Sequence, residues 1–144
     1  MQQPRFAARR YARASMATVA DIMTPSVLSV GPDATLVETA AQMSARKVGA
    51  VLVLEDGRPM GILTERDVLR AVGEGGVERA KVSEWMTRDP ETIEPSESTD
   101  MAATLMIHGG FRHLPVVEQG RVVGIVSIRD LMRVVLDDAA PRGV

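Results

Sequence analysis

The chain contains an internal repeat, which constrains its fold more than any other feature. Displacing the sequence by 63 residues places Val19 on Val82, and the match continues without a gap until Val72 meets Val135. Identical pairs in this register include Met23/Met86, Thr24/Thr87, Pro32/Pro95, Gly57/Gly120, Gly61/Gly124, Arg66/Arg129, Asp67/Asp130 and Arg70/Arg133. Two copies are too few for a solenoid. The repeat therefore predicts two similar halves that cover each other's apolar faces about a pseudo-twofold axis.

Each repeat predicts the same β-α-β-β-α order of elements. In the first copy these are a helical turn at 21–25, a strand at 27–30, a helix at 35–46, strands at 50–54 and 60–63, and a helix at 64–72. Thr35 and Glu38 resemble a capping box, and Gly57 lies in a hairpin turn that favours a positive φ. The predicted fold class is α+β (α/β), with two β-α-β-β-α repeats.

The repeats divide the chain into five segments. These are an Arg-rich N-terminal tail (1–16), the first repeat (17–75), a linker (76–81), the second repeat (82–137) and a C-terminal tail (138–144). The N-terminal tail has four arginines, no acid and no apolar stretch of a secretory signal. A disordered tail, a true start at Met16 or a helix docked on the body would each explain it. An arm for nucleic acid or an anionic membrane is the weaker alternative.

The composition excludes several classes of function. The absence of cysteine excludes disulfides, Cys-ligated zinc or iron–sulfur sites and a thiol nucleophile. No apolar run is long enough for a membrane-spanning helix. With 3% aromatic residues and a net charge of −2, binding to nucleic acid is not expected. His108 and His113 lack the helical zinc spacing, and no hydrolase or phosphate-loop motif occurs. We therefore expect a cytoplasmic protein that is not an enzyme and holds no metal.

The second helix of each repeat carries more apolar residues than one buried face requires. These residues are Val68, Leu69, Ala71 and Val72 in the first copy and Leu131, Met132, Val134, Val135 and Leu136 in the second. Part of this surface packs between the two halves, and the excess predicts that a second copy of the chain covers it. The alternative is a helix that is buried all round within a monomer.

The repeat unit resembles a CBS domain, the module named after cystathionine β-synthase. The residues that carry the resemblance are 21–24, Pro32 and 61–67 in the first copy, and 84–87, Pro95, 112–117 and 124–130 in the second. The resemblance covers residues 17–137. It implies a standalone tandem pair of the prokaryotic type, often called a Bateman module.

The resemblance also implies a function. Such pairs bind adenosine ligands (AMP, ADP, ATP, NAD or S-adenosylmethionine) in clefts between the halves, dimerise into a disc of four CBS domains, and regulate a protein partner. The adenine nucleotide would be a regulatory ligand, and no cofactor is required. The alternative is a structural dimerisation or adaptor module with empty clefts.

The ligand contacts implied by the resemblance begin at the second helix of each repeat. Thr64 and Ser127 stand where a helix begins, and unpaired N–H groups there favour phosphate. In the family the Asp at the positions of Asp67 and Asp130 accepts hydrogen bonds from the ribose hydroxyls. Each Thr/Ser-x-x-Asp sequence is also close to a capping box, which needs no ligand. The two roles are compatible, because a cap can orient a binding carboxylate.

The basic residues point to phosphate. Arg112 and His113 precede a strand, and Arg66, Arg129 and Arg133 lie on the second helices. In the first repeat Gly49 and Ala50 stand at the positions of Arg112 and His113, so the cleft with His113 and Asp130 is expected to favour phosphate more strongly. The alternatives are a solvated face for the helical arginines and a buried structural role for His113.

Adenine is expected between apolar strand edges. We expect Val27–Val30, Val51–Val53 and Ile62–Leu63 in one cleft, and Thr92–Ile93, Leu114–Val116 with Pro115, and Ile125–Val126 in the other. Ser29 and Thr92 occupy matching positions at which family members often hydrogen-bond the base or ribose. Taken individually, each of these two residues fits a polar strand position without a ligand better.

Overall fold

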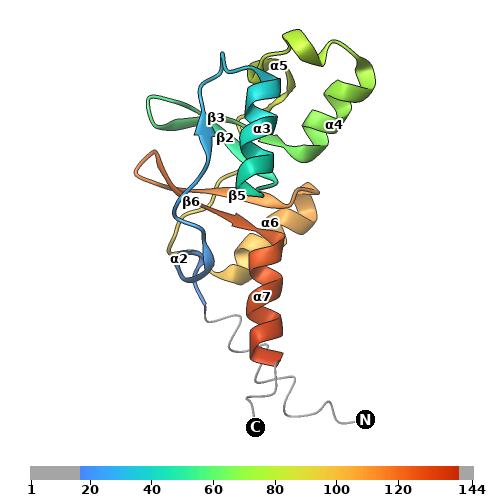
Figure 1. Cartoon of the computed structure of the whole chain (residues 1–144). Coiled ribbons are helices and arrows are strands. Elements are labelled where there is room, and N and C mark those ends of the chain that lie inside the picture. The colour runs from blue at the N-terminus through green and yellow to red at the C-terminus, as the bar shows by residue number, and fades with distance from the viewer. Residues whose placement is uncertain (1–16, 140–144) are drawn as a thin grey trace.

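A computed structural model describes residues 17–139, with side chains from 17 to 136. The chain folds into two stacked α+β halves (Figure 1), as the repeat predicts. Elements of the first repeat are α2 (Val19–Ile22), β1 (Ser29–Val30), α3 (Leu36–Arg46), β2 (Ala50–Glu55), β3 (Arg58–Thr64) and α4 (Glu65–Glu74). After the 3-10 helix η1 (Val77–Arg79), the second repeat contains α5 (Val82–Trp85), β4 (Thr87–Arg88), α6 (Thr99–Gly109), β5 (His113–Glu118), β6 (Arg121–Ser127) and α7 (Ile128–Ala139).

Local chemistry sets most of these boundaries. Thr35 caps α3 by accepting a hydrogen bond from the Glu38 N–H at 3.2 Å. The β2–β3 hairpin turns at Asp56 and Gly57, with φ of 53° and 78°, and the β5–β6 hairpin turns the same way at Gln119 and Gly120. Two successive positive φ values match the right-handed twist of the strands. The predicted helix starts and hairpins are therefore confirmed.

The two halves contain equivalent sheets of different extent. In the first, β1 pairs parallel with β2, and β3 lies antiparallel between β2 and β4. In the second, β5 and β6 form an antiparallel pair, and single bridges at Ile93/Val116 and Thr24/Ile125 take the places of the outer strands. The predicted first strand of the second repeat is thus reduced to a bridge at Ile93.

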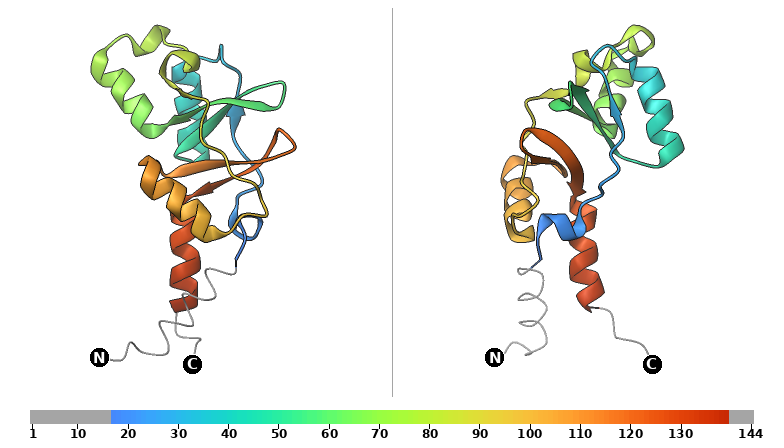
Figure 2. Two further views of the ribbon diagram at one scale, coloured as in Figure 1. Left: turned by 180° about the vertical axis from the view of Figure 1, so that it is seen from behind. Right: turned by 90° about the vertical axis from the view of Figure 1, so that its left-hand side faces the viewer.

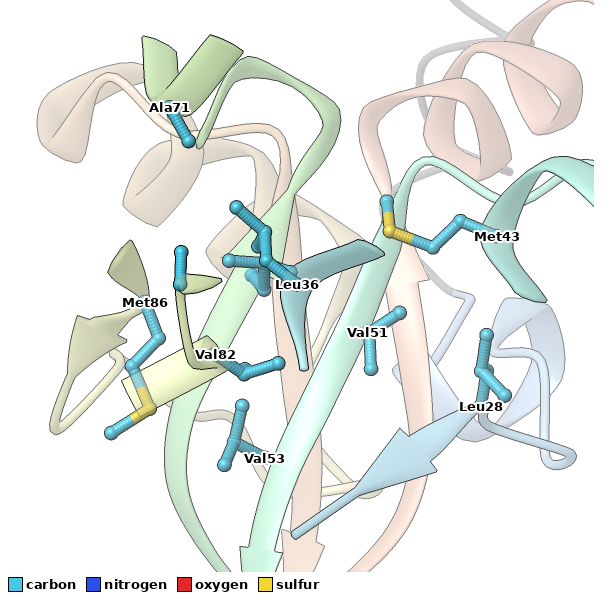
Figure 3. Packing of buried hydrophobic residues seen from close by; sticks show 10 residues of the cluster. Leu28, Leu36, Met43, Val51, Val53, Ala71, Val82 and Met86 are labelled. Carbon is cyan, nitrogen blue, oxygen red and sulfur yellow. The ribbon is translucent and has the colours of Figure 1, made fainter. Parts of the chain in front are cut away.

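The beginning of each repeat packs into the other repeat. Val19, Ile22 and Met23 lie in the core formed by α6, β5, β6 and α7. Val82 and Met86 of the second repeat lie in the first core, beside Leu36 and Val53 (Figure 3). Figure 1 accordingly shows α2 beside α7 in the lower half and α5 beside α3 in the upper half. This exchange was not predicted. Each packed core therefore contains residues of both sequence repeats.

Two glycines permit this exchange. A Cβ on Gly61 would lie 2.5 Å from Sδ of Met86 and 2.8 Å from the backbone oxygen of Thr87. A Cβ on Gly124 would lie 2.7 Å from Sδ of Met23 and 2.9 Å from the backbone oxygen of Thr24. All four distances are far below ordinary contact. The repeated glycine is therefore required by the neighbouring segment of the other repeat.

A third apolar cluster joins the halves. Ala50, Leu52 and Ile62 pack with Val122 and Ile125, so that the first sheet faces β6. Ile62 and Ile125 are equivalent in the two repeats, which places the predicted pseudo-twofold axis near this cluster. Figure 2 shows the two sheets one above the other, with helices on their outer sides.

Two helices extend beyond their predicted ends. α4 continues to Glu74, and Gly75 ends it with a φ of 78°. α7 continues to Ala139, two residues into the segment predicted as the C-terminal tail, so Asp137 and Asp138 belong to a helix. The predicted N-terminal tail and the rest of the C-terminal tail lie outside the described residues. Within residues 17–139 no helix is long and apolar enough to cross a membrane.

Candidate functional site

Two cavities open where the halves meet, one at the start of α7 and one at the start of α4. We name them the Asp130 cavity and the Asp67 cavity, with volumes of about 690 Å³ and about 370 Å³. The first is lined by Thr24, Ser26, Val27, Leu28, Lys47, Val48, Ile125, Ser127, Arg129, Asp130 and Arg133, among others. The second is lined by Ile62, Thr64, Arg66, Asp67, Arg70, Thr87, Pro90, Glu91, Gly110 and Phe111, among others. Most of these residues are equivalent in the two repeats, so the cavities are pseudo-symmetric.

Each cavity contains a helix N-terminus closed by a capping box. The Thr64 N–H and hydroxyl donate to Oδ2 of Asp67 at 2.8 and 3.1 Å. The Ser127 N–H and hydroxyl donate to Oδ2 of Asp130 at 2.8 and 2.9 Å, and the Asp130 N–H donates back to the Ser127 hydroxyl at 3.2 Å. These bonds fix the rotamer of each carboxylate. The cap that the sequence suggests is therefore formed, and it aims a carboxylate at each cavity.

The two carboxylates differ in their second oxygen. Oδ1 of Asp67 lies 3.4 Å from the Arg70 guanidinium, which also stands 5.6 Å above the ring of Trp85. Oδ1 of Asp130 accepts no hydrogen bond from the side chains and backbone that the structure describes. Arg133, the equivalent of Arg70, makes no ion pair with Asp130. Among the described residues, Oδ1 of Asp130 is therefore left as an acceptor without a donor.

His113 begins β5 and lines both cavities. Burial lowers the pKa of its imidazole, while Glu65 and Asp130 oppose that shift and Arg112 and Arg129 add to it. The side chain is therefore neutral at pH 7. A phosphate bound beside it would favour the protonated ring, because an adjacent anion raises a histidine pKa.

The charges that line the cavities are unequal. In the Asp130 cavity the cations Lys47, Arg112, Arg129 and Arg133 face the acids Glu65 and Asp130. In the Asp67 cavity the cations Arg66, Arg70 and Arg112 face the acids Glu65, Asp67 and Glu91. Glu91 stands at the position of Leu28, and Gly110 at the position of Lys47. The larger cavity has the positive balance that an anion requires.

Most of the predicted site residues line a cavity, and four do not. The cavity residues are Thr64, Arg66, Asp67, Ile62, Ser127, Arg129, Asp130, Ile125, Arg112 and His113. Val53 and Pro115 are buried in strands, and Ser29 and Thr92 are exposed; none of them lines either cavity. Their proposed contacts with a ligand receive no support from this placement.

The predicted grouping of strand edges was also wrong. Val27 was expected with Ile62, but it lies in the Asp130 cavity with Ile125. The reason is the exchange of segments. Thr24, just before Val27, bridges to Ile125 in β6 of the second repeat, and β4 of the second repeat pairs with β3 of the first. Glu65 and Glu91 are cavity residues that the sequence reading missed. Comparing unlike pairs in the repeat, Glu65/Ile128 and Leu28/Glu91, would have drawn attention to both.

Neither cavity has the composition of a metal centre. Among the residues that the structure describes, no three His, Asp or Glu side chains gather closely enough to hold an ion. The polar groups of the cavities are instead guanidinium, hydroxyl and carboxylate groups at helix N-termini. Such groups suit an organic ligand with hydroxyls and phosphate.

Two β-α-β-β-α units about a pseudo-twofold axis, with a cavity on each side of their contact, define a tandem α+β repeat pair. The family model of the CBS domain matches residues 19–74 and again 82–137. The chain belongs to the CBS-domain family and is a CBS domain pair, which is a regulatory module.

Known proteins agree with this assignment. The CBS domain-containing protein YhcV of Bacillus subtilis is 39% identical over 117 residues, which are 81% of this chain and 84% of YhcV. A CBS-domain containing protein from Agrobacterium tumefaciens has a similar structure, with a TM-score of 0.76, 38% identity, and coverage of 81% and 98% of the two chains. The CBS domain pair of protein MJ0100, solved with 5′-methylthioadenosine and S-adenosyl-L-methionine, has a TM-score of 0.76 at 26% identity, covering 81% and 94%.

Proposed function

We propose that this protein is a sensor that binds adenosine ligands in its two cavities. The observation that carries the proposal is the pair of carboxylates, Asp67 and Asp130, each fixed by a capping box at a cavity between the halves. An ionised carboxylate suits the two hydroxyls of a ribose, because charge-assisted hydrogen bonds are stronger than neutral ones. The adenosine ligands in the MJ0100 domain pair support this class of ligand.

The Asp130 cavity is the better site for a phosphate-bearing ligand such as AMP, ADP, ATP or NAD. Lys47, Arg129 and Arg133 line this cavity. Of the acids that line it, Asp130 belongs to this cavity alone and Glu65 is shared with the other. Ser127 stands where α7 begins, and the positive end of the helix dipole there favours an anion. Ile125, Val27 and Val48 supply the apolar walls for a base.

The signal is a change in the relative orientation of the halves or of two chains. Each cavity is lined by residues of both repeats, so a bound ligand stabilises the orientation that brings both walls into contact with it. Such a shift is only as large as the difference in ligand affinity between the two orientations. A protein partner that contacts one orientation would then respond to ligand concentration.

A thermal-shift panel tests the sensor function. We expect at least one of AMP, ADP, ATP, NAD or S-adenosylmethionine to raise the melting temperature, because a ligand present at 100 times its Kd adds about 2.7 kcal/mol of stability. The shift should be lost in the double variant Asp67→Ala/Asp130→Ala. A folded protein that responds to none of the five compounds would contradict the sensor and favour a structural dimerisation module.

We propose further that the protein forms a homodimer through α4 and α7. Leu69 and Val72 on α4 are 71% and 56% exposed, and their equivalents on α7, Met132 and Val135, are 57% and 52% exposed. Monomeric proteins rarely leave such paired apolar faces uncovered. Since the same positions are exposed in both repeats, a twofold partner could cover them together.

The dimer predicts a specific effect of one charge. Leu69→Glu should convert the dimer to a monomer in analytical ultracentrifugation, because an unpaired carboxylate would be buried at the contact. Val37→Glu is the control, since Val37 is also exposed, at 49%, but lies on α3. A wild-type protein that sediments as a monomer at high micromolar concentration would refute the dimer.

A further inference from the structure

The two cavities have a common wall. Gly49, Glu65, Arg112 and His113 line both the Asp130 cavity and the Asp67 cavity. Gly49 and Arg112 are equivalent positions immediately before β2 and β5, while His113 begins β5 and Glu65 begins α4. The pseudo-twofold relation brings these places together, so the same side chains face both cavities.

Backbone hydrogen bonds hold this wall in place. The Glu65 N–H donates to the Gly49 oxygen at 3.1 Å, and the equivalent Ile128 N–H donates to the Arg112 oxygen at 2.8 Å. The carboxylate of Glu65 also lies over Gly49, 3.6 Å from where a Cβ would stand. The backbone of Arg112 is therefore anchored to the first turn of α7. This anchor fixes the point from which the Arg112 side chain extends along both cavities.

The shared wall contains one cation, Arg112, and the Asp67 cavity has few others. Arg70 is already paired with Asp67 and stacked on Trp85. Among the described residues, Arg66 is then the one remaining cation that lines the Asp67 cavity alone. Glu91 and the shared Glu65 line the same cavity. Three cations line the Asp130 cavity and not the Asp67 cavity, namely Lys47, Arg129 and Arg133. The Asp130 cavity therefore offers a phosphate more positive charge, and Arg112 and His113 line it as well.

We propose that the shared Arg112–His113 wall serves one phosphate at a time, so that each chain holds one phosphate-bearing adenosine ligand in the Asp130 cavity. The Asp67 cavity then takes an adenosine compound that carries no phosphate. This inference rests on the proposed adenosine sensing and adds the number and the charge class of the ligands. A second phosphate would face the first across the common wall with Glu65 and Glu91 beside it, and like charges at close range repel.

Isothermal titration calorimetry with AMP and 5′-methylthioadenosine tests the inference. AMP should saturate the wild-type protein at one molecule per chain, and methylthioadenosine should bind the AMP-saturated protein at one further molecule per chain. Asp130→Ala should abolish most AMP binding and keep methylthioadenosine binding. Two AMP molecules per chain, or displacement of AMP by methylthioadenosine, would overturn the inference while leaving adenosine sensing intact. Binding of neither compound would overturn the inference, and adenosine sensing would fall with it only if the thermal-shift panel also showed no response.

A charge substitution provides a gain-of-function test. Glu91→Lys replaces an acid of the Asp67 cavity by a cation, and it should raise the AMP stoichiometry from one to two per chain. Glu55→Lys makes the same change at an exposed position that lines neither cavity, and it should leave the stoichiometry at one. If Glu91→Lys also binds a single AMP in the Asp130 cavity, charge does not decide which ligand the Asp67 cavity accepts, and the proposal fails.

The single tryptophan identifies the occupied cavity. Trp85 stacks with Arg70, which is paired with Asp67, so a ligand that engages Asp67 disturbs the ring's environment. Methylthioadenosine should therefore change the tryptophan fluorescence, and one equivalent of AMP should leave it unchanged. A fluorescence change on adding the first equivalent of AMP would place that ligand in the Asp67 cavity and contradict the assignment.

Discussion

Asp130→Ala is expected to lower the affinity for a phosphate-bearing adenosine ligand by about 10- to 150-fold. The reason is the loss of a charged acceptor whose Oδ1 no other described group engages. A hydrogen bond to a charged group contributes about 1.5–3 kcal/mol, which corresponds to that range of Kd. The substitution also opens the capping box with Ser127, so a loss of about 0.5–2 kcal/mol in the free energy of unfolding accompanies it. Calorimetric titration and urea unfolding measure the two effects separately.

The chain offers a matched control for this variant. Asp21 closes the same type of box, with the N–H and hydroxyl of Thr18 donating to its Oδ2 at 2.9 and 3.0 Å, and it lines neither cavity. Asp21→Ala should therefore weaken a cap and leave the Kd unchanged. Equal affinity of Asp130→Ala and the wild type for every ligand that binds would show that Asp130 is only a cap.

Gly61→Ala is expected to destabilise the fold by about 1–3 kcal/mol, the range observed when a well-packed core receives an extra methyl group. The new Cβ would overlap Sδ of Met86 and the backbone oxygen of Thr87. The sulfur can move, but the carbonyl belongs to β4, which pairs with β3 at this point. Relief of the overlap therefore requires β4 to separate from the sheet. Urea denaturation followed by circular dichroism measures the loss.

Gly73→Ala is the control for this prediction. Gly73 lies within α4, and a Cβ there would meet no atom within 4 Å. Alanine at this position should stabilise the protein by about 0.5–1 kcal/mol, because glycine is the poorer helix former. An unfolding midpoint of Gly61→Ala equal to that of the wild type would show that the exchanged segments are not packed as described.

The sequence predicts much of this fold because local signals are strong. Thr35 and Thr64 begin helices, Gly57 turns a hairpin, and a constant displacement of 63 residues repeats the pattern. These features depend on a few neighbouring residues, whose capping and turn preferences are largely independent of the rest of the chain. The spacing of three residues predicts Asp67 and Asp130 as capping partners, and their role in ligand binding came from the resemblance to the CBS domain.

The partners of the repeat segments could not be predicted. In a duplicated sequence, the segment that precedes each first strand can pack on its own half or on the other half with equivalent contacts. Val27 is a case in point, because its expected place beside Ile62 is taken by Pro90 of the other repeat. The asymmetry of charge was missed for a different reason. Glu65 and Glu91 differ from their counterparts Ile128 and Leu28, so the identical pairs of the repeat do not include them.

The exchange of α2 and α5 affects the order in which the two cores can form while the chain is being synthesised. Val19 finds its neighbours Ala102, Leu114 and Val126 only after most of the chain has been synthesised. The first half likewise lacks Val82 and Met86 until translation has passed the linker. All residues of the first core lie between Leu28 and Met86, so that core can close once Met86 has been made, whereas the second core joins Val19 to residues 93–131 and depends on contacts distant in sequence, which form slowly. We therefore expect the first core to form before the second, which closes only when α2 packs against β5, β6, α6 and α7.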